Sequence, residues 1–202
     1  MNSGATAERV YDALKRRLMT HAFRPGHRLD PAALAVPLSS SVTPVRDALH
    51  MLVGETLVET HSGTGFYMPM LDEPLLEDLY AWSAELVALA LRAWPRAAGA
   101  SSVSAEQGRP DIADRAGAVF YAIGQRSPNG EHARAIARLS TRLHAVRTVE
   151  PQVLEAIDEE LGNLETALSG SDRDMLRRLS NAYHRRRQRA AAAIVRAVYR
   201  TG

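Results

Sequence analysis

The order of segments in the first 70 residues constrains this chain more than any other feature. An apolar side chain recurs every four positions over residues 8–21, which predicts a helix there. Arg24-Pro25-Gly26 breaks that pattern, because proline fixes φ and glycine permits a turn. Residues 31–38 are then predicted to form a second, short helix with Asp30 as its N-cap.

A third helix is predicted from Thr43 to Gly54, after a serine-rich turn. Pro44 lies in its first turn, where a missing amide hydrogen costs nothing. The stripe predicted to be buried consists of Val45, Ala48, Leu49 and Leu52. The side chains left facing outward are Thr43, Arg46, Asp47 and His50.

Two short β-prone runs follow the third helix. Leu57-Val58 and Phe66-Tyr67-Met68 flank the glycine-rich stretch His61-Ser62-Gly63-Thr64-Gly65, which predicts a β-hairpin. Three helices followed by a hairpin, within about 70 residues, is the order of a winged helix-turn-helix.

Everything after Pro69 has helical periodicity. Helices are expected from Asp72 to Trp94-Pro95 and then in four further segments, with a polar loop over residues 99–110; the four segments are 111–126, 131–149, 152–168 and 172–200. The fold class is therefore predicted to be mainly α, with a winged helix-turn-helix in residues 1–70 and an antiparallel helical bundle in residues 71–202.

Composition excludes several classes of protein. Cysteine is absent, so disulfides, thiolate metal sites and cysteine nucleophiles are excluded. No apolar run approaches the roughly 20 residues of a bilayer span, and the start of the chain does not resemble a signal peptide, so a cytoplasmic location without membrane contact is expected. No phosphate-binding glycine loop or nucleophile pattern points to an enzyme. The formal net charge of +2 makes no case for nucleic acid by itself.

The N-terminal segments resemble the DNA-binding domain of the GntR family of bacterial regulators. The matching residues are Val10-Tyr11-Asp12-Ala13-Leu14, Arg24-Pro25-Gly26-His27-Arg28-Leu29, Ser41-Val42-Thr43-Pro44-Val45-Arg46-Asp47-Ala48-Leu49, and Leu57-Val58 leading to Gly63-Thr64-Gly65-Phe66-Tyr67. The resemblance implies a homodimeric regulator that reads double-stranded operator DNA with the third helix. The DNA-contacting candidates are Arg28, Ser41, Thr43, Arg46, His50, His61 and Thr64.

Alternative explanations apply to these candidates. Arg46 suits a bidentate contact to guanine, but a surface salt bridge with Asp47 or Glu55 would also account for it. A plain tight hairpin would account for the glycines at the wing tip. Val42 stands where the family usually has a DNA-contacting arginine, and Ala32 where a charged residue is common. An unusual operator, or more reliance on phosphate contacts and DNA shape, is therefore expected.

The C-terminal bundle resembles, more weakly, the helical effector domain of the fatty-acid-regulator branch of that family. Many members of that branch hold a divalent metal with one aspartate and three histidines. The corresponding positions here are Gly117, Tyr121, Leu161, and either Tyr183 or His184. Glycine and leucine offer no lone pairs, so neither metal nor cofactor is expected. His132, His144 and His184 lack ligand spacing and are not expected to replace the site.

Two hypotheses for the bundle stay open at this point. In the first, the chain is a repressor switched by a small-molecule effector held near Tyr121, Tyr183 and His184, with phenols favouring a less acidic or more aromatic ligand. In the second, those tyrosines are ordinary core residues and the bundle only dimerises or binds a partner. The arginine-rich segment 173–200 favours a solvated helix face over a second nucleic-acid surface.

Overall fold

The computed structural model describes residues 3–20, 22–61, 65–95 and 111–201. It divides into two compact units: unit 1 contains residues 1–71 and 198–202, and unit 2 contains residues 72–197. The loop predicted over residues 99–110 and the wing-tip residue Thr64 lie outside the described residues. Each unit is described by itself below.

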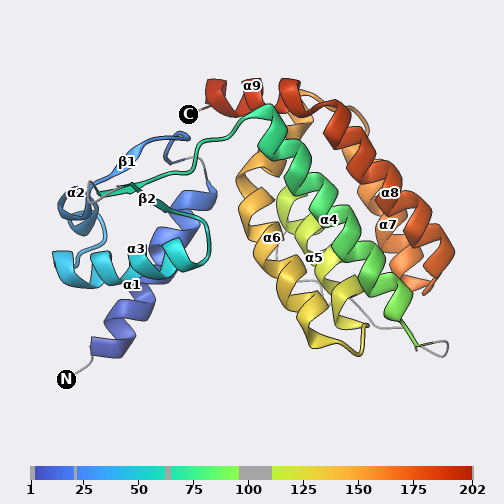
Figure 1. Cartoon of the computed structure of the whole chain (residues 1–202), viewed down its shortest axis with the longest axis horizontal. Coiled ribbons are helices and arrows are strands. Elements are labelled where there is room, and N and C mark those ends of the chain that lie inside the picture. Colours follow the sequence, from blue (N-terminus) through green and yellow to red (C-terminus); the bar gives the residue numbers. More distant parts are fainter. Residues whose placement is uncertain (1–2, 21, 62–64, 96–110, 202) are drawn as a thin grey trace. The chain divides into compact units, whose positions relative to one another are not determined.

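Unit 1 begins with three helices (Figure 1), which are α1 (Ser3–Met19), α2 (Pro31–Ala35) and α3 (Val42–Gly54). The carboxylate of Asp30 accepts the amide hydrogen of Ala32, which confirms Asp30 as the N-cap of α2. α2 ends at Ala35, before residue 38. Pro37 accounts for the early end, because it has no amide hydrogen to donate to the carbonyl of Ala33.

A small antiparallel sheet completes unit 1. Its strands are β1 (Arg28–Leu29), β2 (Glu59–His61) and β3 (Gly65–Tyr67), in the order β1-β3-β2. The hairpin is present, but its first strand begins at Glu59 and not at Leu57; Leu57 and Val58 are buried instead. β1 was not expected, because a two-residue strand is too short to show a periodic pattern.

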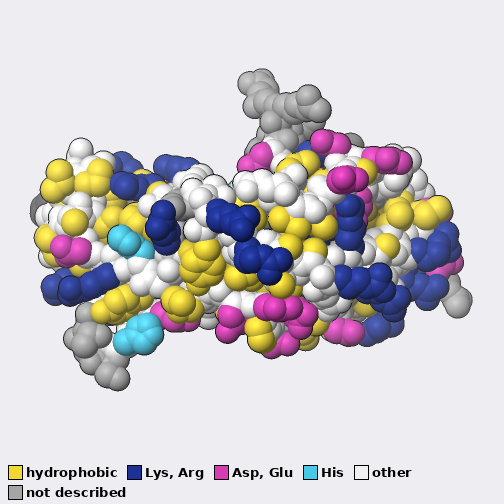
Figure 2. Space-filling model, turned by 90° about the horizontal axis from the view of Figure 1, so that it is seen from above, with side chains coloured by type: hydrophobic (Ala, Val, Ile, Leu, Met, Phe, Trp, Pro, Cys, Tyr) yellow, Lys and Arg dark blue, Asp and Glu magenta, His cyan; other side chains and the backbone are white. Residues whose placement is uncertain are grey.

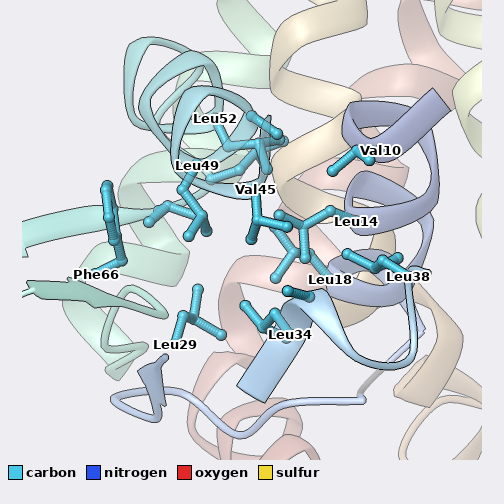
Figure 3. Close-up of a cluster of buried hydrophobic side chains, with 14 residues drawn as sticks. Val10, Leu14, Leu18, Leu29, Leu34, Leu38, Val45, Leu49, Leu52 and Phe66 are labelled. Atoms are coloured by element: carbon cyan, nitrogen blue, oxygen red, sulfur yellow. The ribbon is translucent and has the colours of Figure 1, made fainter. Parts of the chain in front are cut away.

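The core of unit 1 is entirely apolar (Figure 3). Fourteen side chains from the three helices and the sheet form one buried cluster, including Val10, Leu14, Val45, Leu49 and Leu52 at 0% exposure. Burying each leucine or valine in full is worth roughly 1.5–3 kcal/mol. The periodic apolar positions of the sequence therefore meet in one cluster that sets how α3 is held.

Unit 2 is an antiparallel helical bundle (Figure 1). Its main helices are α4 (Glu73–Ala93), α5 (Ile112–Gln125), α6 (Gly130–Val149), α7 (Ile157–Ser169) and α8 (Arg173–Arg189). The last helix, α9 (Ala191–Thr201), begins in unit 2 and ends in residues that belong to unit 1. Four of them start with a side-chain cap, from Asp72, Asp111, Asn129 and Asp172. α4 packs against α6 and α8, and α5 packs against α6 and α7. The predicted fold class is confirmed.

Two helix boundaries in unit 2 differ from expectation. The segment predicted over 152–168 is a 3₁₀ turn, Glu150–Gln152, followed by α7 from Ile157, because Ala156 adopts a left-handed φ of 51°. The helix predicted over 172–200 is interrupted at Ala190, and no proline or glycine marks that break. Among the described helices, each is too short or too polar to cross a bilayer.

Candidate functional site

The two faces of α3 differ sharply in exposure. Val45, Leu49 and Leu52 are 0% exposed and face the core of unit 1. On the opposite side of the helix Thr43, Arg46 and His50 are exposed, as the helical period predicted. Thr43, Arg46 and His50 are called the outward row below. These three side chains therefore lie on the face of α3 that the helical period predicts.

Arg46 has no hydrogen-bond or ion-pair partner among the described residues. Glu55, one of the two acids considered as its partner, is engaged elsewhere: its Oε2 lies 2.7 Å from Lys15 Nζ, and its Oε1 accepts the hydroxyl of Tyr11. The salt-bridge explanation of Arg46 through Glu55 is therefore wrong.

The Lys15–Tyr11–Glu55 cluster ties α1 to the C-terminal end of α3. Lys15 Nζ also donates to the Tyr11 hydroxyl at 2.8 Å. Burial lowers the pKa of Lys15, but the hydrogen bonds to Glu55 and Tyr11 outweigh burial and the pKa is raised. Lys15 therefore stays charged and holds the two helices together.

A second contact fixes the turn that leads into α3. Ser39 adopts a left-handed φ of 47°, and its amide donates to the carbonyl of Val36 at 3.1 Å. Arg9 of α1 donates to the carbonyl of Leu38 at 3.1 Å. Ser41 is the N-cap residue of α3, but its side chain makes no capping hydrogen bond.

Aromatic contacts join α3 to the wing. The ring of His50 meets Phe66 edge-on, with centroids 4.9 Å apart. On β2, the ring of His61 meets Tyr67 at 4.9 Å, and its Nε2 lies 3.9 Å from a carboxylate oxygen of Glu59. His50 and His61 are both exposed despite these contacts.

Arg28 lies against Gly65 of the wing. Its Nε would be 3.5 Å from a Cβ built on that glycine, and Gly65 has a φ of +121°, which favours glycine. The backbone conformation alone accounts for glycine at this position, since 3.5 Å is an ordinary van der Waals contact. Of the predicted DNA-contacting residues, Thr64 lies outside the described residues, and the other six are exposed on α3, its N-cap or the sheet; these six are Arg28, Ser41, Thr43, Arg46, His50 and His61.

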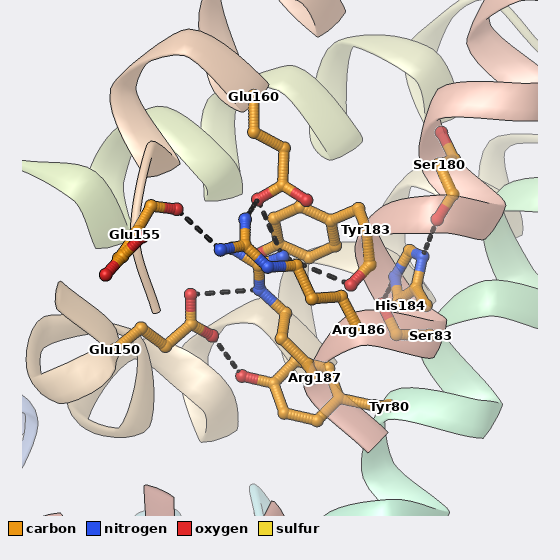
Figure 4. A network of polar contacts seen from close by, with 10 residues as sticks. All are labelled: Tyr80, Ser83, Glu150, Glu155, Glu160, Ser180, Tyr183, His184, Arg186 and Arg187. Carbon is orange, nitrogen blue, oxygen red and sulfur yellow. Dashed lines mark hydrogen bonds and ion pairs between the residues drawn. The ribbon is translucent and has the colours of Figure 1, made fainter. Parts of the chain in front are cut away.

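The interior of unit 2 holds a polar network that the sequence did not predict (Figure 4). Arg187, 0% exposed, donates from Nε to Glu150 Oε2 at 2.9 Å and from Nη1 to Glu160 Oε2 at 2.8 Å. The other oxygen of the buried Glu150 carboxylate accepts the hydroxyl of Tyr80. Burial, and then the nearby Glu150 charge, hold the pKa of Tyr80 well above its usual value.

His184 is enclosed in the same interior (Figure 4). It is 1% exposed; its Nδ1 lies 2.6 Å from the carbonyl oxygen of Ser180 and its Nε2 lies 2.9 Å from the hydroxyl of Ser83. A neutral ring fits both contacts, by donating to the carbonyl and accepting from the hydroxyl. Burial lowers the pKa of His184 to about 3, because an enclosed site disfavours the charged ring.

The three effector candidates are placed differently. Tyr121 is 40% exposed on α5, so it does not border the buried interior as expected. Tyr183 is buried, with the Arg187 guanidinium carbon 3.2 Å from its ring centroid. His184 is buried too, at 1% exposure. Successive helix positions face different neighbours, so both residues can be enclosed when helices pack on two sides.

The arginine-rich segment is also only partly as predicted. Arg185 and Arg189 are exposed, but Arg187 is completely buried and ion-paired. The face shown in Figure 2 carries both basic and acidic side chains. The three histidines considered as metal ligands make separate contacts: His132 with Ser127, His144 with Asp114, and His184 in the interior.

Comparisons with known proteins give this arrangement a context. Residues 6–68 match the family described as bacterial regulatory proteins, gntR family. A curated relative, the Nta operon transcriptional regulator of Aminobacter aminovorans, is 38% identical over 74 residues. That match covers 37% of this chain and 35% of the relative, so it spans about a third of either protein.

Two solved structures resemble nearly the whole chain. A crystal structure from Rhodococcus sp. RHA1, described as a GntR transcriptional regulator, has a TM-score of 0.70 at 16% identity and covers 94% of this chain and 98% of its own. E. coli McbR/YncC has a TM-score of 0.60 at 22% identity, with 96% and 98% covered. At these identities the likeness establishes the fold alone.

Proposed function

Because the chain belongs, through residues 6–68, to the gntR family of bacterial regulatory proteins, we propose that it is a transcriptional regulator that binds double-stranded DNA with α3. The observation that carries this proposal is the outward row. Its side chains are exposed and Arg46 has no partner among the described residues, although the opposite face of the same helix is fully buried. A helix entering the major groove needs such a face.

Several side chains on α3 and at its N-terminus have a defined chemical role in the proposal. Arg46 can donate two parallel hydrogen bonds to O6 and N7 of guanine. Ser41 and Thr43 stand at the N-terminus of α3, where hydroxyls and free amides suit a phosphate. Val42, 37% exposed, offers an apolar contact such as a thymine methyl in place of a charged reader.

The wing and β1 contribute backbone contacts in this proposal. Arg28 and His61 are exposed on the sheet and suit a phosphate or the minor groove. Such contacts position the protein on the duplex without reading sequence. Because only Arg46 of the outward row is a strong base reader, discrimination should depend on few base pairs and on DNA shape.

We further propose that the protein acts as a homodimeric repressor under effector control. A two-fold dimer would bind a pseudo-palindrome with half-sites about one helical turn apart. The buried polar interior of unit 2 supports an effector, since polar groups placed inside a core are costly unless they serve binding or specificity. The alternative is a bundle used only for dimerisation, in which DNA affinity would not respond to any small molecule.

The test begins with selection of bound sequences from random DNA, followed by affinity measurements on the selected site. Arg46→Ala should weaken specific binding by about 1–3 kcal/mol and relax selectivity at one base pair of each half-site. Arg138→Ala, at an exposed arginine of α6, is the matched control and should bind like wild type. Unchanged affinity in Arg46→Ala would remove Arg46 from the proposed interface, and failure to enrich any sequence would refute specific DNA binding.

A further inference from the structure

The outer surface of unit 2 carries a groove at the C-terminal end of α8. The groove has a volume of about 420 Å³, and its lining residues are Ala182, Arg185, Arg186, Arg189 and Ala190; it is called the arginine groove below. Ala182, Arg185 and Arg189 are exposed, and the other two residues are half-buried. Volumes between roughly 300 and 1,000 Å³ are typical of small-molecule sites. The groove is therefore large enough for a small ligand and is open to solvent, unlike the enclosed interior of the unit.

Helical spacing brings the three arginines of the groove together. Arg185 and Arg189 are four positions apart, and Arg186 lies between them in the sequence, so the three side chains share about one turn of α8. Ala182 and Ala190 carry only methyl groups and leave space beside the arginines. From Ala182 to Ala190 the chain advances about 12 Å along the helix axis. The groove is therefore short, and guanidinium groups dominate its lining.

Two arginines of the groove have no partner among the described residues. Arg185 and Arg189 are exposed, and neither makes a hydrogen bond or an ion pair there. The only acidic residue in the segment 173–201 is Asp174, and it pairs with Arg177 near the other end of α8. The donors of Arg185 and Arg189 are therefore available to a ligand.

The third arginine of the groove is held in place by the protein. Arg186 donates from Nη2 to the carbonyl of Glu155 at 2.5 Å (Figure 4). Its Nη1 lies 3.7 Å from Glu160 Oε2, but that oxygen is closer to Nη1 of the buried Arg187, at 2.8 Å. Because no carboxylate lines the groove and Glu160 is shared with Arg187, the groove keeps a net positive charge. Such a surface attracts anions.

We propose that the arginine groove binds a small molecule that carries two or more phosphate groups. A guanidinium pairs with a phosphate through two parallel N–H donors, and three guanidinium groups offer more donors than one phosphate uses. A phosphate fits better than a carboxylate, because it brings three terminal oxygens and up to about two negative charges. A compact ligand fits the short groove better than a DNA duplex, whose charges extend along its whole axis. Such binding is independent of DNA recognition by α3.

The first test titrates the full chain with sodium tripolyphosphate, pyrophosphate and orthophosphate by calorimetry at constant ionic strength. Tripolyphosphate should bind at least about tenfold more tightly than orthophosphate, because it engages more guanidinium groups at once. The double variant Arg185→Gln/Arg189→Gln should weaken tripolyphosphate binding at least about tenfold. Both side chains are exposed, so the melting temperature of this variant should stay that of wild type. Equal affinity for the three anions, or unchanged tripolyphosphate binding in the variant, would overturn the inference.

A matched control distinguishes the groove from the net charge of the chain. Arg138→Gln/Arg142→Gln removes two arginines with the same four-residue spacing from α6, and it changes the net charge by the same amount. Tripolyphosphate affinity should change less than about twofold in this control, because charges far from the ligand are screened. A loss as large as that in Arg185→Gln/Arg189→Gln would mean that net charge alone attracts the anion, against the inference.

A variant that fills the groove tests its shape separately from its charge. Ala182→Leu keeps all three arginines and places a larger apolar side chain at an exposed position of the lining. Tripolyphosphate binding should weaken at least about threefold, because the added side chain occupies part of the volume that a ligand needs. Unchanged affinity would show that the anion is attracted to an exposed charged surface and is not held in a groove, and the inference would fail.

Two further probes test the chemical class of the ligand. Hexaglutamate and a short DNA duplex are titrated into wild type and Arg185→Gln/Arg189→Gln. Hexaglutamate should bind wild type more weakly than tripolyphosphate does, and the affinity for the duplex should be nearly the same in both proteins. A duplex or a peptide that binds wild type more tightly than tripolyphosphate, and loses that affinity in the variant, would identify the groove as a nucleic-acid or acidic-peptide site and overturn the inference. Tripolyphosphate binding by a chain that enriches no DNA sequence would support the groove and refute the proposed function.

Discussion

The cores of the two units are built on opposite principles. Unit 1 buries fourteen apolar side chains, and none of its described polar or charged residues falls in the fully buried class. Unit 2 buries Arg147, Glu150, Ser180, His184 and Arg187 among its leucines. An apolar core fixes the shape of a unit without burying polar groups. The polar side chains of unit 1 then lie at the surface, where α3 presents Arg46. A core that contains charges is less stable than an apolar one, because buried charges lose their hydration. Such a cost is expected where the polar groups form a binding site inside the protein.

The largest expected effect tests whether the polar core is held by its charges. Glu150→Ala removes the shared acceptor of Tyr80 and Arg187 and leaves a completely buried guanidinium with only Glu160 as counter-ion. We expect a loss of about 3–5 kcal/mol in the free energy of unfolding, measured by urea denaturation. Glu131→Ala, which breaks an exposed pair with Arg134, should cost less than about 1 kcal/mol. Equal losses in the two variants would contradict the distinction between the cores.

The apolar core of unit 1 should respond to volume and not to charge. Leu49→Ala deletes a fully buried side chain on the inner face of α3 and should cost about 2–4 kcal/mol in unfolding free energy. Met51→Ala changes a neighbouring side chain that is 54% exposed, and little loss is expected there. Because Leu49 supports the outward row, its loss should also weaken DNA binding. If Leu49→Ala has the same unfolding free energy as wild type, this core tolerates a cavity.

Acid should destabilise unit 2 through His184. The folded ring has a pKa of about 3 and the unfolded ring one near 6.5, so between these values the unfolded chain binds the extra proton. Stability therefore falls as the pH drops below about 6.5, by about 1 kcal/mol per pH unit. Melting temperatures from pH 7.5 to 5.5 should decline in wild type and decline less in His184→Asn. The described histidines of unit 1 are all exposed. If the melting temperatures of wild type and His184→Asn fall equally with pH, a group other than His184 causes the loss of stability.

The smallest expected effect concerns the Lys15–Tyr11–Glu55 cluster between α1 and α3. Lys15 and Glu55 are 27% and 32% exposed, and the solvent screens a pair of that kind. Lys15→Met should reduce unfolding free energy by no more than about 1 kcal/mol, and high salt should remove most of the difference. Urea denaturation at low and high salt measures this, with Arg16→Met as an exposed control on the same helix. A loss of unfolding free energy above about 2 kcal/mol in Lys15→Met would mean that the Lys15–Tyr11–Glu55 cluster supports the fold and not only the alignment of the helices.

The contrast between the cores also explains how far the sequence could be interpreted. Apolar side chains at helical spacing predicted the inner and outer faces of α3, and Asp30 and Asp72 predicted two helix starts, since each depends on neighbours along the chain. The Arg187–Glu150 pair joins residues 37 positions apart on different helices, so no local pattern announces it. The arginines near residue 187 were all expected at the surface for that reason. The interruption at Ala190 likewise has no signal in the local sequence.

Arg9 and Lys15 give the helix-turn-helix a mechanical property. Arg9 is bonded to the turn before α3, and Lys15 is bonded to Glu55 just beyond the far end of α3, so α1 braces α3 at both ends. We therefore expect α1 and α3 to move together as one rigid body. In the dimer proposed above, a signal would then change the separation or tilt of the two DNA-binding units and would leave the shape of each unit as it was.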